Sequence, residues 1–206
     1  FVVREIRNRL EEAGVPVEGS KGEWGHGQQE INLRHGDPLV TADRHVLYKH
    51  GAKEIAWQKG VSATFMAKPD AGQAGSSFHL HASLWDAKLK KNLLWDDRKS
   101  AASPLFGSAM AGTLALARDF SLFFAPTVNS YKRYVASSFA PTRLAWGRDN
   151  RTTGLRVVGR GGSFRIENRV PGADANPYLA FAATIAAFLH GAEKGLKTPP
   201  EFKGDA

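Results

Sequence analysis

The stretch Phe78-His79-Leu80-His81-Ala82-Ser83-Leu84 alternates apolar and polar side chains, which is the pattern of a half-buried β-strand. Successive side chains of a strand point to opposite faces, so His79, His81 and Ser83 share the polar face. Neutral imidazole is a good metal ligand, and a second imidazole or a hydroxyl can donate to phosphate oxygens. This face predicts a site for a metal-bound nucleotide. Alternation alone gives equal weight to a strand whose polar face only meets water.

A second alternating run, Phe164-Arg165-Ile166-Glu167-Asn168-Arg169-Val170, places Arg165, Glu167 and Arg169 on one face. In such a row the carboxylate can ligate a hard metal while planar guanidinium groups grip phosphate or carboxylate oxygens. The alternative is an exposed Arg-Glu-Arg ladder, which contributes little to stability.

A third run, Gly27 to Leu33, carries Glu30, and Glu23 lies seven positions before it. On a straight strand the two carboxylates would face opposite ways. The glycines at 25 and 27 favour a turn or bulge that brings them to one site. Paired carboxylates without thiolates favour Mg²⁺ or Mn²⁺, whereas the commoner case for any two acids is that they are simply exposed.

Further arginines lie in polar segments of the second half of the chain: Arg133, Arg151 and Arg156. With Arg165 and Arg169 they make five cations beside carboxylates, histidines and glycine-rich loops. That ensemble is what transfer of a phosphoryl group between two anionic substrates requires.

The composition narrows the function classes. A chain of 206 residues is long enough for one domain with a real core, and the absence of cysteine excludes disulfides, thiolate zinc sites and a cysteine nucleophile. No apolar run approaches the roughly 20 residues of a membrane span, so we expect a cytoplasmic protein without a membrane partner. The net charge of +8 is spread along the chain, which favours a basic surface over a nucleic-acid partner.

Helical patterns surround the three strands. Helices are expected over Phe1 to Ala13, from an Asp43 cap to Trp57, over Pro104 to Arg118, and from Asn176-Pro177 to Leu189. The last is apolar nearly all round, which predicts burial. Lys88 to Lys91 and Asp96 to Lys99 indicate a surface hairpin or loop. The fold class is α+β: a curved, mostly antiparallel sheet with the site on one face and helices on the other.

Several motifs resemble the catalytic domain of the glutamine synthetase family in order and spacing, from Gly22 to Leu189. They are Glu23-x-Gly-x-Gly27-Gln28-x-Glu30, Ala63-Thr64-Phe65-Met66-Ala67-Lys68-Pro69, Gly75-Ser76-x-x-His79-x-His81-x-Ser83-Leu84, Asn129-Ser130-Tyr131-Lys132-Arg133, Asn150-Arg151, Arg165-x-Glu167-x-Arg169 and Pro171-Gly172-Ala173-Asp174-Ala175-Asn176-Pro177-Tyr178-Leu179.

The resemblance implies ATP, two divalent metal ions (Mg²⁺ or Mn²⁺) and glutamate as ligands. It implies that Glu23 and Glu30 bind one metal ion and that His79 and Glu167 bind the other. It implies that Arg133 binds the α-carboxylate of glutamate and that Gly75 lies in the glutamate loop. It also implies that Arg151 and Arg169 contact the transferred phosphoryl group, that Arg156 and Arg165 contact ATP, and that His81 and Ser83 lie along the nucleotide. The implied reaction is attack of the γ-carboxylate of glutamate on ATP to give a γ-glutamyl phosphate, followed by displacement of phosphate by an amine.

Two positions depart from the ammonia-using enzymes of the family. Phe139, in Ser137-Ser138-Phe139-Ala140-Pro141, stands where those enzymes carry a glutamate that helps deprotonate ammonium, and an apolar ring cannot take up a proton. This form is more similar to the γ-glutamylpolyamine synthetase branch, which uses a larger amine. Ala74 replaces the loop asparagine before Gly75. The alternatives are a glutamine synthetase proper using ammonia, or a non-catalytic relative retained for assembly.

The resemblance also implies a longer parent protein. Residues 1–206 correspond to the catalytic domain without its N-terminal domain, its C-terminal end and the further metal carboxylates of an upstream strand. The family forms ring-shaped homo-oligomers in which that N-terminal domain completes the neighbouring active site. We therefore expect this piece alone to lack full ligase activity.

Overall fold

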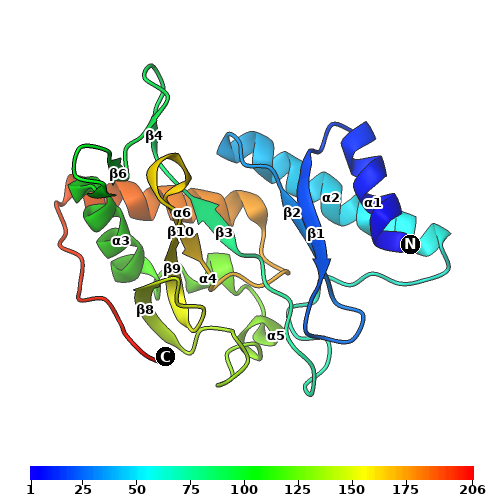
Figure 1. Ribbon diagram of the computed structural model, residues 1–206. Helices are drawn as coiled ribbons and strands as arrows, with labels where there is room; N and C mark the ends of the chain where they lie inside the picture. The colour runs from blue at the N-terminus through cyan, green and yellow to red at the C-terminus, as the bar shows by residue number, and fades with distance from the viewer.

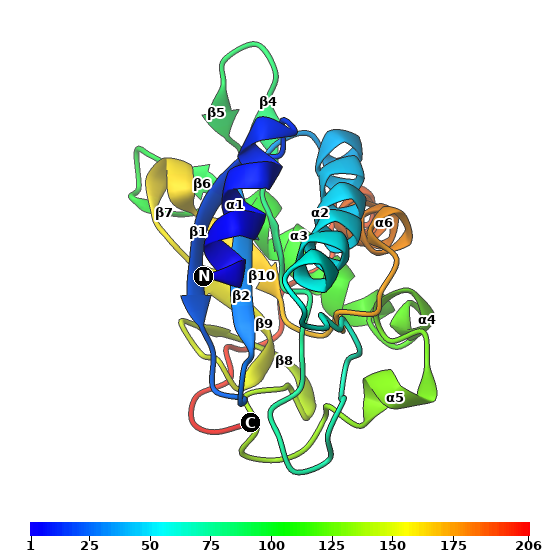
Figure 2. The same ribbon diagram turned by 90° about the vertical axis from the view of Figure 1, so that its right-hand side faces the viewer.

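The N-terminal part of the chain forms a β-hairpin covered by two helices (Figure 1). The computed structural model describes all residues, 1–206. Helix α1 (Val2–Glu12) is followed by β1 (Val17–Gly22), β2 (Gln29–Leu33) and α2 (Pro38–Gln58). Their buried side chains form a small core: Ile6, Leu10, Val15, Val17 and Ala52. The hairpin is thus supported by its own helices and is a separate two-stranded sheet (Figure 2).

The start of α2 corrects one sequence prediction. The N-cap is Asp37, whose side chain accepts a hydrogen bond from the Leu39 amide at 3.0 Å, and Pro38 occupies the first turn. The predicted cap, Asp43, lies inside the helix and accepts from the Tyr178 hydroxyl at 2.6 Å. An Asp directly before a Pro satisfies both preferences of a helix start, and this pair was the stronger signal.

The main sheet has the strand order β3-β10-β9-β8. Its strands are β3 (Leu80–Ala82), β8 (Arg143–Arg148), β9 (Thr153–Val158) and β10 (Arg165–Asn168). β10 pairs antiparallel with β3 and β9, whereas β8 pairs parallel with β9. The predicted α+β class with a mostly antiparallel sheet is confirmed. The two predicted strands in this sheet, 78–84 and 164–170, are shorter than expected.

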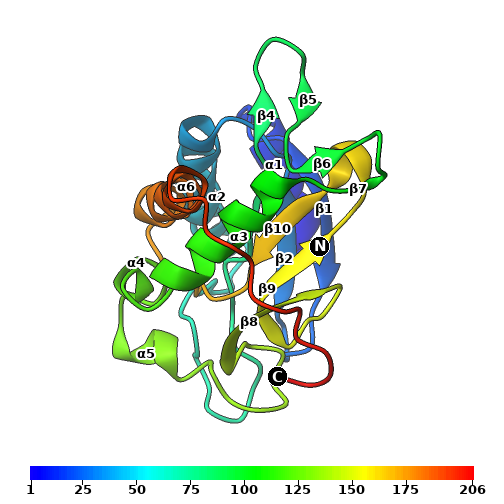
Figure 3. The ribbon, with the colours of Figure 1, turned by 90° about the vertical axis from the view of Figure 1, so that its left-hand side faces the viewer.

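Two small hairpins extend from one end of the sheet (Figure 3). The first pairs β4 (Trp85–Asp86) with β5 (Lys91–Asn92), and the second pairs β6 (Trp95–Asp96) with β7 (Ala101–Ala102). A 3-10 turn, η1 (Gly161–Ser163), leads into β10. The prediction of a surface hairpin or loop for Lys88 to Lys91 and for Asp96 to Lys99 is confirmed, because each stretch lies in one of these hairpins.

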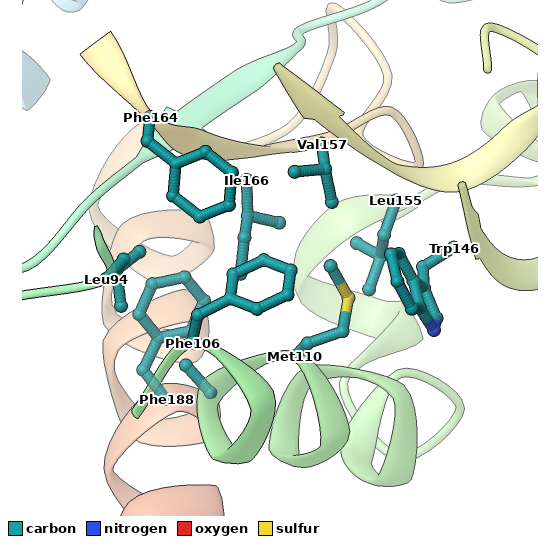
Figure 4. Packing of buried hydrophobic residues seen from close by; sticks show 10 residues of the cluster. Leu94, Phe106, Met110, Trp146, Leu155, Val157, Phe164, Ile166 and Phe188 are labelled. Carbon is teal, nitrogen blue, oxygen red and sulfur yellow. The ribbon is translucent and has the colours of Figure 1, made fainter. Parts of the chain in front are cut away.

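Helices α3 (Pro104–Leu116) and α6 (Pro177–Glu193) cover the apolar face of the main sheet. Figure 4 shows Ile166 and Val157 of the sheet facing Phe106 and Met110 of α3. The two helices cross closely because they meet at glycines. A Cβ on Gly112 would lie 2.1 Å from the Ala187 carbonyl oxygen. With this face filled, the opposite face of the sheet is left for polar side chains.

The predicted burial of the last helix is wrong for one side of it. Ile185 and Leu189 of α6 are 40% and 50% exposed, because only one side of the helix meets α3 and the sheet. Two short helices, α4 (Ser121–Phe124) and α5 (Val128–Tyr131), connect α3 to β8 at the other end of the molecule (Figure 3). None of the helices combines the length and the apolar character that a membrane-spanning helix needs.

Candidate active site

Glu167 lies at the centre of the polar face. β10 is flanked by β3 and β9, and the register places Glu167 opposite His81 on one side and Arg156 on the other. Its carboxylate side chain is only 4% exposed. Four groups surround it: His79 Nδ1 and His81 Nε2 lie 3.3 and 3.6 Å from Oε1, Arg169 Nη1 lies 3.1 Å from Oε1, and Arg156 Nη1 lies 3.1 Å from Oε2. The two alternating runs therefore meet in one charged cluster.

The charges of this cluster follow from its burial. Burial alone would raise the pKa of Glu167, but the positive charges facing it, those of Arg169 and Arg156 among them, hold its pKa below the usual range. Burial lowers the pKa of His79 to about 3, and the charge of Arg169 adds to this effect. Glu167 is thus an anion beside a neutral imidazole, a pair of donors suited to a divalent cation.

His81 is fixed by its neighbour on the next strand. Arg165 Nε donates to His81 Nδ1 at 2.9 Å, so the proton of the neutral ring is on Nε2, the atom that faces Glu167. Further along, Trp85 Nε1 donates to the Ser83 hydroxyl at 2.9 Å. His79 and His81 lie on one face as predicted, since both meet Glu167, whereas Ser83 lies beyond the end of β3 and is held by Trp85.

Arg169 joins this cluster to two loops. Its Nε donates to the Arg151 carbonyl oxygen and its Nη2 to that of Phe139, both at 3.1 Å. Phe139 has a positive φ of 58°, which is uncommon for a bulky residue, and its side chain is half-exposed. The loops that carry Phe139 and Arg151 are therefore anchored to β10 by one guanidinium group.

Glu23 and Glu30 come together on the hairpin. Glu23 follows β1 and Glu30 lies in β2, with the Glu23 amide donating to the Gln28 carbonyl oxygen at 3.0 Å. Lys21 Nζ lies between the carboxylates, 2.8 Å from Glu23 and 3.6 Å from Glu30. The strand predicted over Gly27 to Leu33 begins only at Gln29, and a tight turn between two strands, rather than a bulge within one, unites the acids.

Lys21 was missed by the sequence interpretation. It lies directly opposite Glu30 in the hairpin register. Partial burial opposes ionisation of Glu23, but the hydrogen bond from Lys21 and the charges of Lys21 and Arg151 hold the Glu23 pKa below its usual range. The charge of Arg151 also reaches Arg169. Arg151 is exposed, and its charge acts both on Glu23 of the hairpin and on Arg169 of the Glu167 cluster.

Gly75 and Arg133 form a third part of the site. Arg133 is 3% exposed, and its guanidinium group donates to the carbonyl oxygens of Val170 at 3.0 Å and Arg169 at 3.4 Å. A Cβ on Gly75 would lie 2.6 Å from Arg133 Cγ, so only glycine lets this loop approach. Gln28 Nε2 donates to the Gly75 carbonyl oxygen at 3.0 Å, which ties the hairpin to the same loop.

The sequence interpretation also missed two acids. Asp149 accepts from Arg156 Nε at 3.0 Å, so it shares this arginine with Glu167. Asp174 accepts from the hydroxyls of Thr127 and Ser130. Neither belongs to an alternating run, so periodicity offered no signal. No group of three or more His, Asp or Glu side chains is arranged to hold a metal, and the predicted ligands form two separate donor pairs.

Comparison with known proteins places this geometry in a family. Residues 2–206 match the family model described as glutamine synthetase, catalytic domain. The γ-glutamylethanolamide synthetase GlnA4 of Streptomyces coelicolor is 50% identical over 210 residues, covering 100% of this chain and 44% of that protein. A glutamate–isopropylamine ligase of a Pseudomonas species is 42% identical, covering 100% of this chain and 45% of that protein.

Among solved structures, a GmaS/ADP complex superposes with a TM-score of 0.90 at 35% identity, covering 99% of this chain and 48% of that one. The chain thus spans less than half the length of each of these relatives. The similarity in sequence and in structure extends over practically the whole of this chain. This chain belongs to the glutamine synthetase family and matches its catalytic domain.

Proposed function

We propose that this chain is the catalytic-domain part of a longer ATP-dependent ligase that joins the γ-carboxylate of glutamate to an amine through a γ-glutamyl phosphate. The observation that carries this proposal is the buried anion Glu167, held between neutral His79 and the guanidinium groups of Arg156 and Arg169. Buried charge without a ligand is costly, and such clusters gather at functional sites.

The nucleotide would lie on the polar face of the main sheet. His79 and Glu167 would hold one divalent cation, because a neutral imidazole and a carboxylate are its ordinary ligands. Arg156 and Arg165 would contact ATP, with His81 and Ser83 along the nucleotide. The short contact of Arg165 with His81 supports this arrangement, since it aligns two of the proposed contacts beside each other.

The second cation would bind Glu23 and Glu30 on the hairpin. The residues fit, because these two carboxylates already hold the ammonium group of Lys21 between them. Each pair supplies only two protein ligands, which leaves positions for phosphate, water or ligands outside this chain. When bound, Mg²⁺ or Mn²⁺ would offset the charge of the phosphate groups.

The proposed chemistry uses the arginines for position and charge. Arg133, beside the Gly75 loop, would bind the α-carboxylate of glutamate. A γ-carboxylate oxygen attacks the γ-phosphorus of ATP, and ADP leaves; the charges of Arg151 and Arg169 oppose the repulsion between the two anions. The amine nitrogen then attacks the acyl carbon, phosphate leaves, and the nitrogen loses a proton.

The amine would be larger than ammonia. Phe139 offers a half-exposed ring and no proton acceptor at the anchored loop. The names of two similar proteins, an ethanolamide synthetase and an isopropylamine ligase, support an alkylamine or an amino alcohol. A third relative is a γ-glutamylputrescine synthetase of Escherichia coli, 39% identical over 93% of this chain, which keeps polyamines among the candidates.

The test is phosphate release by the full-length protein with Mg²⁺, ATP, glutamate and a panel of amines. The panel contains ammonium, ethanolamine, isopropylamine, putrescine and spermidine. We expect release that requires all three substrates and is fastest with one of the larger amines. No amine-dependent release with any of them would reject the ligase, and a clear preference for ammonium would reject the interpretation of Phe139.

The companion variant is Phe139→Glu, in which a carboxylate becomes available to take up a proton. We expect the ratio of ammonium use to alkylamine use to rise. Wild-type selectivity in this variant would show that the ring does not select the amine. The ring-shaped homo-oligomer and the cytoplasmic location expected from the sequence stay predictions.

A further inference from the structure

Asp174, in the segment between β10 and α6, anchors the helix that precedes Arg133. Its Oδ2 accepts hydrogen bonds from the hydroxyls of Thr127 at 2.9 Å and Ser130 at 2.7 Å. These two residues form the capping box of α5, and Ser130 is fully buried. The Arg133 amide in turn donates to the Ser130 carbonyl oxygen at 3.3 Å. One carboxylate oxygen therefore fixes the start of the turn that ends at Arg133.

The other oxygen of Asp174 is buried and has no hydrogen-bond partner. It faces Gly172, where an added Cβ would lie 2.6 Å from Asp174 Oδ1 and 3.5 Å from Arg133 Nη1. The carboxylate and the guanidinium group thus flank the same glycine. Any larger residue at position 172 would come between them.

Arg133 needs such an anion nearby. Its guanidinium group donates hydrogen bonds to carbonyl oxygens alone, lies 5.6 Å from the centroid of the Tyr134 ring, and forms no ion pair with any carboxylate. Burial lowers the pKa of Arg133, whereas the negative charge of Asp174 acts in the opposite direction. A buried carboxylate that is close but not paired can offset the cost of burying this cation without occupying the donors that the two carbonyl oxygens leave for a ligand.

We propose that Asp174 is a positioning residue for Arg133: it fixes α5 through Thr127 and Ser130 and supplies the negative charge that keeps the guanidinium group aligned for a substrate carboxylate. Gly172 keeps the space between the two charges. This inference rests on the proposed function, in which the carboxylate bound by Arg133 is that of glutamate. Asp174 itself would not touch the substrate, because the oxygen that faces Arg133 is fully buried.

The experiment compares the Michaelis constants for glutamate and for ATP in variants of the full-length protein. Asp174→Asn keeps an oxygen for the two hydroxyls and removes the charge, whereas Asp174→Ala removes both. We expect the KM for glutamate to rise about tenfold in Asp174→Asn and more in Asp174→Ala, as for loss of a charged interaction. The KM for ATP should change less than about threefold, since the nucleotide contacts lie on the sheet.

Two further variants separate position from general stability. Ser130→Ala removes one hydrogen bond to Asp174 and leaves its charge, so we expect a smaller rise in the KM for glutamate than in Asp174→Asn. Asp43→Asn is the matched control, because Asp43 of α2 also accepts from a hydroxyl but is itself exposed. It should leave both Michaelis constants unchanged.

Equal changes in the two Michaelis constants, or an unchanged KM for glutamate in Asp174→Asn, would overturn the proposal. If the wild-type protein shows no glutamate-dependent turnover, the ligase function fails, and a crystal structure of the Asp174→Ala variant then decides about Asp174. The proposal requires the Arg133 guanidinium group to leave its place on the Val170 carbonyl oxygen. An unmoved guanidinium group would refute it.

Discussion

The two carboxylate sites of this protein are built in opposite ways. Glu167 lies in β10, an inner strand of the main sheet, is 4% exposed, and contacts two histidines and two arginines. Glu23 and Glu30 lie on a separate hairpin, their side chains are 33% and 35% exposed, and a single flexible lysine spans them. The first site is fixed by strands on both sides and by a filled core below, whereas the second depends on one turn.

The difference shows how one active site can combine rigidity with exchange. A buried, fully surrounded carboxylate keeps its neighbours in place before a ligand arrives, which is the arrangement that favours electrostatic stabilisation of a reaction. The exposed carboxylates Glu23 and Glu30 cost little stability when no metal ion is bound, since water and Lys21 can interact with them. We therefore expect the Glu167 cluster to matter for folding and for chemistry, and the hairpin pair to matter for ligand binding alone.

The largest expected effect is that of Glu167→Gln. This change leaves Arg169 and Arg156 buried beside a neutral group, and breaking a buried charge cluster costs about 3–5 kcal/mol. The matched change on the hairpin, Glu30→Gln, should alter the free energy of unfolding by less than about 0.5 kcal/mol. Urea unfolding measures both. Similar losses in the two variants would show that the sites do not differ in the way described.

The next largest effect is a pH dependence of the folding stability, caused by the buried His45. His45 of α2 stacks on Phe78 with ring centroids 4.1 Å apart, its Nε2 is buried without a partner, and burial lowers its pKa to about 3. Between pH 6.5 and 3 the unfolded chain binds a proton there that the folded protein does not. Stability should therefore fall as the pH decreases through this window, by about 1.4 kcal/mol per pH unit from this group.

His45→Phe should remove this contribution, so that unfolding free energies measured from pH 7 to pH 4.5 decline less steeply than in the wild type. His50→Phe on the same helix is the control, because His50 is exposed, and its decline should match the wild type. Parallel curves for His45→Phe and the wild type would rule out the role of His45.

Alanine substitutions of two glycines compare how tightly the backbone is packed beside Arg133 and in the hairpin. A Cβ on Gly75 would lie 2.6 Å from Arg133 Cγ and 2.8 Å from the Ala67 carbonyl oxygen, whereas a Cβ on Gly19 in β1 meets nothing within 4 Å. We expect Gly75→Ala to cost about 1–3 kcal/mol and to raise the KM for glutamate. Gly19→Ala should be nearly neutral in both measurements. A neutral Gly75→Ala would mean that the loop and Arg133 can move apart freely.

The smallest effect on stability is expected for Lys21→Met. Lys21 is 56% exposed, so its ion pairs should contribute less than about 0.5 kcal/mol. Removing its charge should, however, tighten Mn²⁺ binding at Glu23 and Glu30 about threefold, because a competing cation is gone. Calorimetric titration with Mn²⁺ measures this, with Lys53→Met of α2 as the control. Unchanged or weaker binding would show that Lys21 does not compete with the metal.

Much of the site could be predicted because strand alternation is a local property. The face shared by His79 and His81, and that shared by Arg165 and Glu167, follow from a period of two along the chain. The helix starts at Pro104 and Asn176 were also local, since each carries its cap and proline in adjacent positions. The α2 start was missed at Asp37, although its signal was equally local.

The rest depended on contacts between segments far apart in the sequence. No pattern within one strand could show that Glu167 lies opposite both His81 and Arg156, or that Lys21 lies opposite Glu30, because register is set by the packing of whole elements. The contact of Asp174 with the capping box of α5 joins positions 44 and 47 residues apart, so it too was invisible.

The sequence by itself therefore determined which side chains share a strand face, where most helices begin, and which family this protein resembles. Only the tertiary structure decided which strand faces meet and which carboxylates are buried or exposed. It also decided which arginine or lysine side chain lies beside each carboxylate. The physical reason is that secondary structure follows from residues within a few positions of one another. Burial and pairing, which set the charges of the site, follow from the packing of distant elements against one core.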